Sequence, residues 1–306
     1  MKSSILKGYW LTILSTLAFS NVYVFSKAAL NEVSLPLFLF VAFSVGFGVN
    51  LVLFFISGKN RPDYRSVRGI WWVFPLLGLL ESFTVSTFYA SVNAITEPSV
   101  TGFLGNLFPL FTTILGFLFL KERFTLIESG GVLLVFAGAV VSGYSGNLSL
   151  NSFFIPGAGL VVLNCLGAAT ATVIVRAKVD RIPPATLSLN RTFWLLLFSS
   201  VWFFSTGEAL TLSGRALMNI SAAAILDPVL AILLAYKAYQ YIEASRGTII
   251  QSLKGLIIIP FAYICFGTLP FGYQIVGGII ATAGVMIMAF GQQLWGEGQK
   301  GKHTGK

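Results

Sequence analysis

Four ionisable residues stand inside apolar segments of the chain: Glu81, Arg191, Asp227 and Lys254. A charged group near the centre of a bilayer is costly, so it normally faces the protein interior or a water-filled cavity. Two acids and two bases balance in sign, which permits internal ion pairs. The acids could relay protons or bind a cationic group, and Lys254 could bind a carboxylate or phosphate. These residues are the first candidates for a functional site.

Each of the four also has a structural interpretation. Either acid could pair with Arg191 or Lys254 and so hold neighbouring helices together. Pro228 follows Asp227, and a carboxylate can satisfy backbone groups at a helix irregularity. Arg191 could instead extend toward the cytoplasmic surface, because a long basic side chain can keep its charged end in water. The sequence leaves both interpretations open.

One helical face carries Lys254 together with Gln251. At i, i+4, i+7 and i+11 spacing the same face also holds Gly247 and Ile258. A glycine and an amide on one face indicate proximity to another backbone or to water. We therefore expect Lys254 and Gln251 to line a cavity or to be buried against another helix.

Two asparagines inside apolar segments, Asn21 and Asn106, are candidates for neutral contacts with a solute. Asn106 shares a helical face with Gly102, Pro109 and Thr113. Pro109 frees a backbone carbonyl, and the asparagine side chain supplies both a donor and an acceptor. This face could bend and bind a solute, or it could pack against another helix through small and polar residues.

The composition requires a membrane environment. The chain has 306 residues, of which 56% are hydrophobic and only 10% are charged, and its mean hydropathy is +0.83, whereas soluble domains carry about 25% charged residues. The net charge of +9 lies in short clusters without a continuous basic stripe, so no nucleic-acid partner is expected. Cys165 and Cys265 lack metal-ligand spacing, and no phosphate-binding loop is present. We expect no cofactor and no enzymatic activity.

The apolar runs predict an all-α membrane protein with ten transmembrane helices, because a helix needs about 20 apolar residues to cross the hydrocarbon core. The expected spans are 6–30, 34–57, 69–91, 97–120, 126–144, 156–176, 184–206, 217–239, 244–265 and 271–291. A flexible cytoplasmic tail is expected over 292–306.

The basic residues predict the orientation. With ten spans, one side of the membrane would hold Lys2, Lys7, Lys59, Arg61, Arg65, Arg68, Lys121, Arg123, Arg176, Lys178, Arg181, Lys237, Arg246, Lys300, Lys302 and Lys306. The opposite side would hold only Lys27 and Arg215. By the positive-inside rule, the N- and C-termini both lie in the cytoplasm, and we expect the bacterial inner (cell) membrane as the location.

The second half of the chain repeats features of the first. An offset of 146 residues pairs Glu81 with Asp227, Gly131 with Gly277 and Gly138 with Gly284. The expected repeats are 1–146 and 147–291, with five spans each. Because five is odd, the second repeat must enter the membrane from the opposite face, an inverted arrangement typical of secondary transporters.

The chain resembles the EamA-type family of ten-helix transporters in the drug/metabolite transporter superfamily. The resemblance covers nearly the whole chain and rests on Ser20-Asn21 with Lys27, Pro36 and Pro183, and the segment TEPSVTGFLGNLFPLFTTILGFLFLKERFT followed by GGVLLVFAGAVV. It implies an exporter or permease, in which the fifth and tenth helices stand away from the cavity. The glycine segments 131–138 and 277–284 are then expected to serve helix packing or a homodimer contact.

The sequence therefore predicts a secondary transporter that moves a small polar or amphipathic metabolite by alternating access. An amino acid is one candidate solute, and proton coupling through Glu81 or Asp227 is one option. An uncoupled facilitator or a carrier of a lipid-linked head group is the alternative, and a receptor or membrane enzyme fits less well. The expected partners are the solute and membrane lipids.

Overall fold

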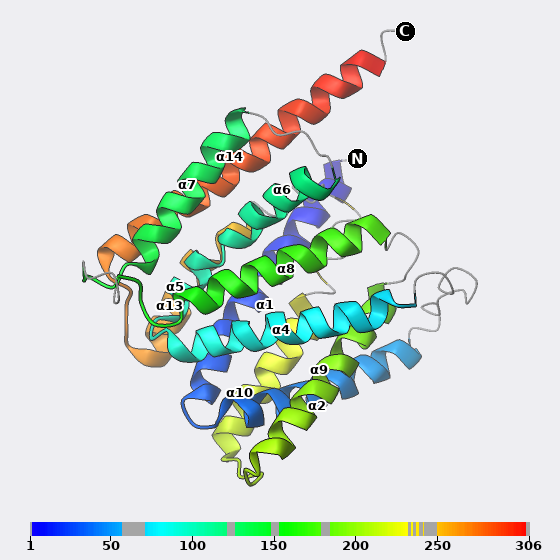
Figure 1. Ribbon diagram of the computed structural model, residues 1–306, viewed down its shortest axis with the longest axis vertical. Coiled ribbons are helices and arrows are strands. Elements are labelled where there is room, and N and C mark those ends of the chain that lie inside the picture. The colour runs from blue at the N-terminus through cyan, green and yellow to red at the C-terminus, as the bar shows by residue number, and fades with distance from the viewer. Residues whose placement is uncertain are drawn as a thin grey trace.

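The computed structural model describes residues 2–56, 71–120, 126–147, 153–178, 184–231, 234, 237–238, 241 and 250–303. These residues form helices, and an isolated bridge joins Tyr144 and Phe154. The elements are α1 (Lys2–Leu30), α2 (Leu35–Ile56), α4 (Val73–Ala94), α5 (Pro98–Leu104), α6 (Leu107–Leu120), α7 (Leu126–Gly143), α8 (Ala158–Lys178), α9 (Pro184–Thr206), α10 (Gly214–Ile225), the π-helix η1 (Leu226–Ala231), α13 (Lys254–Phe266) and α14 (Gly272–His303) (Figure 1).

Helical residues occur in each of the ten expected ranges. Among the described residues, six helical segments are long and apolar enough to cross a membrane: Leu6–Leu30, Leu35–Ile56, Val73–Ala94, Pro98–Phe119, Leu126–Gly143 and Gly272–Ala289. Shorter apolar helices cover Ala158–Ile174 and Ile250–Phe266. The all-helical membrane architecture is therefore present, and the count of ten spans stays a prediction.

Three elements differ from their expected form. The expected helix over 97–120 is interrupted at Gly105 and Asn106, where Gly105 N–H bonds Thr101 O and Phe108 N–H bonds Gly105 O. Pro109 explains the break, because it has no N–H to donate to the carbonyl four residues earlier. The expected helix over 217–239 begins at Gly214 and continues as the π-helix around Pro228. The helix α14 extends to His303, into the segment 292–306, whose flexibility stays a prediction.

The helix α7 lies against α14 along a seam of glycines. A Cβ atom built on Gly138 would lie 2.4 Å from the backbone nitrogen of Ala281, and one on Gly284 would lie 2.6 Å from the backbone nitrogen of Val135. Small residues allow such close backbone approach, which replaces the hydrophobic effect as a source of helix association in lipid. The expected packing role of the two glycine segments is confirmed, and the two segments pack against each other.

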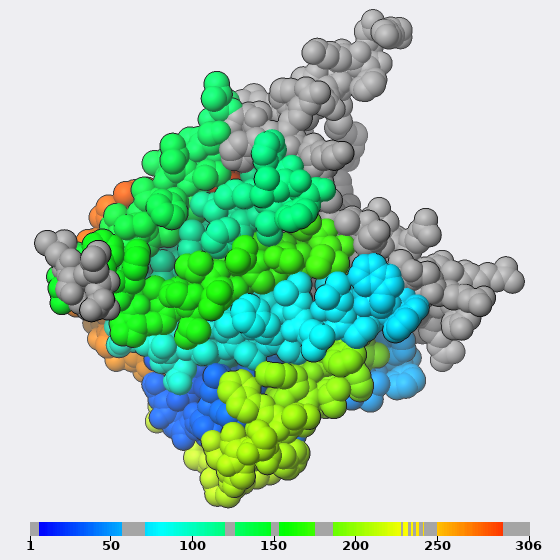
Figure 2. Space-filling model, viewed as in Figure 1, coloured from blue at the N-terminus to red at the C-terminus, as the bar shows by residue number. Residues whose placement is uncertain are grey.

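The helices α1, α2, α4, α9, α10 and α13 share the largest hydrophobic core cluster among the described residues. Its fully buried members include Phe38, Tyr89, Leu195, Ile220 and Ile258. The helix α4 contacts α8 and α9, while α1 contacts α10 and α13. On one face of the molecule α7, α6, α8, α4 and α9 lie side by side as diagonal bands (Figure 2). The start of α1 and the end of α14 lie toward the same end of the bundle (Figure 1). The cytoplasmic location of that end stays a prediction from the Lys and Arg positions.

Candidate functional site

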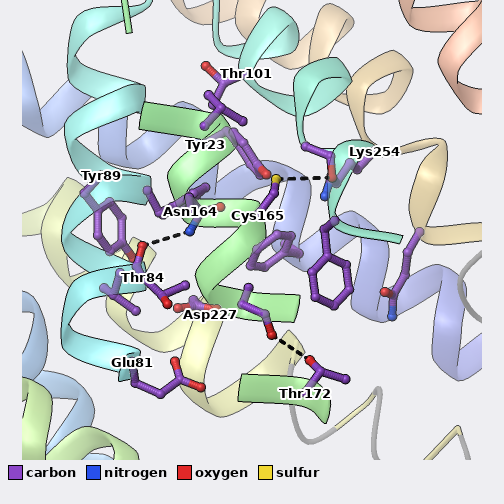
Figure 3. Close-up of a pocket in the computed structure, with 18 of the residues that line it drawn as sticks. Tyr23, Glu81, Thr84, Tyr89, Thr101, Asn164, Cys165, Thr172, Asp227 and Lys254 are labelled. Atoms are coloured by element: carbon purple, nitrogen blue, oxygen red, sulfur yellow. Dashed lines mark hydrogen bonds between the residues drawn. The ribbon is translucent and has the colours of Figure 1, made fainter. Parts of the chain in front are cut away.

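A cavity of about 310 Å³ lies between the helices, and Figure 3 shows residues that line it. This volume is at the lower end of the range for small-molecule sites. Its charged lining residues are Glu81 from α4, Arg191 from α9, Asp227 from η1 and Lys254 from α13. The rest of the wall comes from α1, α4, α5, α6, α8, Gly105 and Gln251. Residues far apart in the sequence thus face one common space.

At one end of the cavity a single arginine contacts both acids. Arg191 Nε donates to Glu81 Oε2 at 2.9 Å, and Arg191 Nη1 lies 3.9 Å from Asp227 Oδ2. The side chain of Asp227 is 7% exposed, whereas that of Glu81 is 26% exposed. The closer ion pair, Arg191 with Glu81, is therefore the more solvent-exposed one. Asp227 is buried and lies farther from Arg191. With all three groups ionised, this acid cluster carries one net negative charge.

The local backbone explains how Asp227 reaches this position. Asp227 lies in the first turn of the π-helix, next to Pro228. A proline inside a helix removes one backbone donor, and π-helical turns are frequent at functional sites. Ser15 Oγ of α1 donates to the carbonyl of Ala231 at 2.8 Å and so fixes the end of this turn. The irregular turn is therefore held against α1 while Asp227 faces the cavity.

At the other end lies Lys254, the first residue of α13. Its Nζ is 5.8 Å from the centroid of the Phe19 ring. A Cβ atom built on Gly105 would lie 3.0 Å from the same Nζ, so the ammonium group rests against the break between α5 and α6. Within the described ranges no carboxylate lies within 4.0 Å of this ammonium. Figure 3 shows Lys254 and Glu81 on opposite sides of the cavity.

Neutral and aromatic side chains form the wall between the two ends. Asn164 Nδ2 of α8 donates to the carbonyl of Thr84 in α4 at 2.8 Å, a bond drawn in Figure 3. The Phe88 ring packs edge to face with the rings of Tyr89 and Tyr23, with ring centroids 4.8 Å and 5.1 Å apart respectively. The cavity thus offers a cation at one end, acids at the other and an amphipathic wall between them.

Comparison with known protein families identifies the family of this chain. The sequence matches the EamA-like transporter family in two segments, residues 6–144 and 155–290. The chain belongs to the EamA-like transporter family. It is accordingly a member of the drug/metabolite transporter superfamily and an integral, multi-pass membrane protein. The family and the name of its relative indicate a membrane transporter.

Similar proteins agree with this family assignment. An uncharacterized transporter of Synechocystis sp. is 20% identical over 269 residues, which cover 84% of this chain and 76% of that protein. The Crt homolog 2 of Dictyostelium discoideum is 34% identical over 92 residues, which cover 27% of this chain and 19% of that protein. A solved crystal structure shares the fold, with a TM-score of 0.66 at 15% identity, over 94% of this chain and 96% of that one.

In this EamA-like transporter most of the residues expected at the site line the cavity. They are Glu81, Arg191, Asp227, Gln251 and Lys254. The interpretation in which Arg191 extends to the cytoplasmic surface is wrong, because its guanidinium pairs with both acids. Those ion pairs hold three elements together, so the structural interpretation of the acids is confirmed alongside their place in the cavity.

The two asparagines lie elsewhere in the transporter. Asn21 Nδ2 donates to the carbonyl of Leu17 in its own helix at 2.9 Å. Asn106 is buried, and its Nδ2 donates to Thr282 Oγ1 of α14 at 3.2 Å. Neither residue lines the cavity, so the packing interpretation fits Asn106 and a local backbone bond explains Asn21. Gly247, expected on the face of Lys254, lies outside the described residues.

Several lining residues were not expected from the sequence. They include Phe19, Tyr23, Thr84, Phe88, Tyr89 and Thr172. A signal for part of this set exists in α4, because Glu81, Thr84, Val85, Phe88 and Tyr89 follow the i, i+3, i+4, i+7, i+8 spacing of one helical face. Residues on the same helical face as an intramembrane acid are therefore further candidates for the lining of a cavity.

Proposed function

We propose that the chain is a secondary transporter for a small zwitterionic metabolite such as an amino acid. One observation carries this proposal: a single cavity presents Lys254 at one end and the acid cluster of Glu81, Arg191 and Asp227 at the other. A solute with a carboxylate and an ammonium group would match these two ends in charge. The aromatic wall would accommodate an apolar part of the solute.

Each end of the cavity has a distinct role in binding. Lys254 would bind the solute carboxylate or phosphate as a point charge. Asp227 would bind the solute ammonium or carry a proton, since its contact with Arg191 at 3.9 Å is longer than a hydrogen bond. Gln251 and Asn164 would supply neutral polar contacts. Because two acids share one arginine, a proton or a cation can bind without breaking the 2.9 Å pair of Arg191 and Glu81.

Transport would proceed by alternating access between two inverted five-helix repeats, residues 1–146 and 147–291. The helix contacts support this arrangement, because exchanging the two halves converts most of the larger contacts between the halves into one another or into themselves. The contact α4–α8 corresponds to α1–α10, α6–α8 to α1–α13, and α4–α9 to α2–α10. The contacts α2–α9, α5–α13 and α7–α14 correspond to themselves. The two segments matched by the family divide the chain near the same point.

This arrangement has ten spans with both termini in the cytoplasm, in the bacterial inner membrane. Inverted repeats place the solute site near the middle of the membrane, at the interface between the repeats. The cavity fits this expectation, because its lining combines α1, α4, α5 and α6 of the first repeat with α8, α9, η1 and α13 of the second.

The test is solute uptake into proteoliposomes that contain the purified protein. A labelled panel of amino acids, amines and carboxylates would be offered at two pH values, with Glu81→Gln, Asp227→Asn and Lys254→Gln variants. Arg215→Gln is the control, because Arg215 is an exposed cation whose partner is Glu32. We expect zwitterions to be taken up and Lys254→Gln to slow their uptake. A pH dependence that disappears in one acid variant would support proton coupling, and uptake of all charge classes alike would contradict the proposal.

A further inference from the structure

The two basic residues of the cavity differ in how their charge is balanced. Arg191 contacts two carboxylates, at 2.9 Å and 3.9 Å. Lys254 has no carboxylate within 4.0 Å in the part of the chain that the structure describes, and its ammonium lies over the Phe19 ring. Glu81 lies across the cavity from Lys254 (Figure 3), and both Glu81 and Asp227 already pair with Arg191. Among the described residues, the carboxylates that line the cavity are therefore those that already pair with Arg191.

Alternating access passes through a state in which the cavity is closed to both sides. Closure removes most of the water that solvates Lys254. A charge inside a membrane protein without a partner is strongly unfavourable, whereas an ion pair with further hydrogen bonds is tolerated. An anionic group on the solute would provide that partner. The free-energy barrier to closure should therefore be lower for the loaded transporter than for the empty one.

We propose that this protein is an exchanger, in which Lys254 allows the cavity to change sides only when a carboxylate or phosphate of the solute is bound to it. This inference rests on the proposed function and adds the mode of transport to it. An exchanger moves one solute inward for each solute moved outward. Net uptake of solute into empty vesicles is then slow. After it has released its solute, the transporter would have to close around the Lys254 ammonium without an anionic partner before it could return to the outer side.

The surroundings of Lys254 support a role in closure as well as in binding. Lys254 begins α13, which packs on α5 through Gly102 and Gly255, where a Cβ on Gly102 would lie 3.0 Å from the Cα of Gly255. Its ammonium rests against Gly105 at the break between α5 and α6. The charge of Lys254 thus lies where α13 of the second half contacts the interrupted helix α5–α6 of the first half. A helix can bend at such an interruption.

The test compares uptake of a radiolabelled mixture of the standard L-amino acids into three kinds of proteoliposome. One is loaded with the same unlabelled mixture, one with the corresponding amino-acid amides, and one with buffer alone. For the unaltered protein we expect uptake at least about tenfold faster into vesicles loaded with amino acids than into the other two, since a tenfold ratio corresponds to a modest difference in closure free energy. The amides keep the ammonium group but lack the carboxylate, so they should not stimulate uptake.

The variant Lys254→Met should bring the ratio of loaded to empty uptake close to one, whereas Lys254→Arg and the surface control Arg215→Gln should retain it. Equal uptake into all three vesicles by the unaltered protein would overturn the exchange inference and leave the proposed transporter standing. Stimulation by the amides, or a ratio unchanged in Lys254→Met, would also overturn it. Absence of uptake under every condition would instead contradict the proposed function, and the exchange inference with it.

Discussion

The two halves of the transporter meet in two very different ways, at the seam of α7 with α14 and around the cavity. At the seam, glycines bring backbone against backbone, and a Cβ atom on Gly138 would lie 2.4 Å from Ala281 N. Around the cavity, helices of the two halves are joined by an ion-pair cluster and by polar bonds such as that of Asn164 to Thr84. These helices surround a cavity of about 310 Å³.

The difference separates the task of holding the halves together from the task of transport. A close glycine contact loses its packing energy as soon as the backbones part, so the seam is suited to a fixed contact. Charged groups beside a cavity can exchange partners with water, protons or solute. We therefore expect substitutions in the seam to affect folding, and substitutions in the cavity to affect transport more than folding.

The largest effect is expected for Gly138→Val in the seam. The new side chain would collide with the backbone of Ala281, which cannot move without separating α7 from α14. We expect a loss of about 3 kcal/mol or more in stability, or no folded protein, as is typical of severe overpacking. The measurement is thermal unfolding of detergent-solubilised protein.

The matched control is Gly130→Val on the same helix. A Cβ atom built on Gly130 has no neighbour within 4 Å. This variant should unfold at nearly the temperature of the unaltered protein. If both variants were equally stable, the seam would not be the fixed contact described here.

The next effect is expected for Arg191→Met in the cavity. This change leaves Glu81 and Asp227 without their shared cation. We expect uptake to fall at least about tenfold and stability to fall by roughly 1 to 3 kcal/mol, the usual result of breaking a buried polar network. Adding Glu81→Gln and Asp227→Asn should restore stability without restoring uptake, because the charges are then removed together. A variant with normal uptake would exclude the cluster from transport.

A smaller effect is expected from Asn164→Leu. Asn164 joins α8 to α4 across the cavity wall, whereas Asn21 bonds only within its own helix. The first substitution should lower uptake several-fold in the same vesicle assay, and Asn21→Leu should leave uptake nearly unchanged. If uptake were equal in the two variants, the position of Asn164 in the cavity wall would not contribute to transport.

The smallest effect is expected from Gly105→Ala. The added methyl group would lie 3.0 Å from Lys254 Nζ, and the flexible end of the lysine can move away from it. We expect the KM for uptake to rise by roughly two- to fivefold with little change in the maximal rate, because one good electrostatic contact contributes about 1 kcal/mol. Gly159→Ala, at a position with no neighbour within 4 Å, is the control. A fall in the maximal rate alone would contradict a binding role for Lys254.

Much of this organisation follows from the sequence, for simple physical reasons. Long apolar runs identify membrane helices, and charges such as Glu81 and Lys254 inside those runs must avoid lipid. Five of the seven residues expected at the site therefore line one cavity. The glycine spacing likewise indicates a packing stripe on each of α7 and α14, although it does not say that the two stripes face each other.

The asparagines and the aromatic residues show where the sequence is not sufficient. An amide inside a helix can bond its own backbone, as Asn21 does, or a neighbouring helix, as Asn106 does, and both choices satisfy the same side chain. Phe88 and Tyr89 resemble any other aromatic residues in a membrane helix until the tertiary contacts are known. Pro228 marks the helix irregularity in the local sequence, but the hydrogen bond from Ser15 of α1 to the carbonyl of Ala231 at the end of the π-helix is a tertiary contact that local sequence does not encode.

The most direct test of the central claim, that the solute passes through this cavity, is the accessibility of a single cysteine at position 168. Ala168 lines the cavity, whereas Leu166 is exposed on the outer face of the same helix. With Cys165 and Cys265 replaced by alanine, a membrane-impermeant thiol reagent should label Ala168→Cys from either side of the membrane, and a transported solute should slow the labelling. Leu166→Cys should show no protection by the solute. Labelling of Ala168→Cys from one side only, with no effect of solute, would contradict transport by alternating access through this cavity.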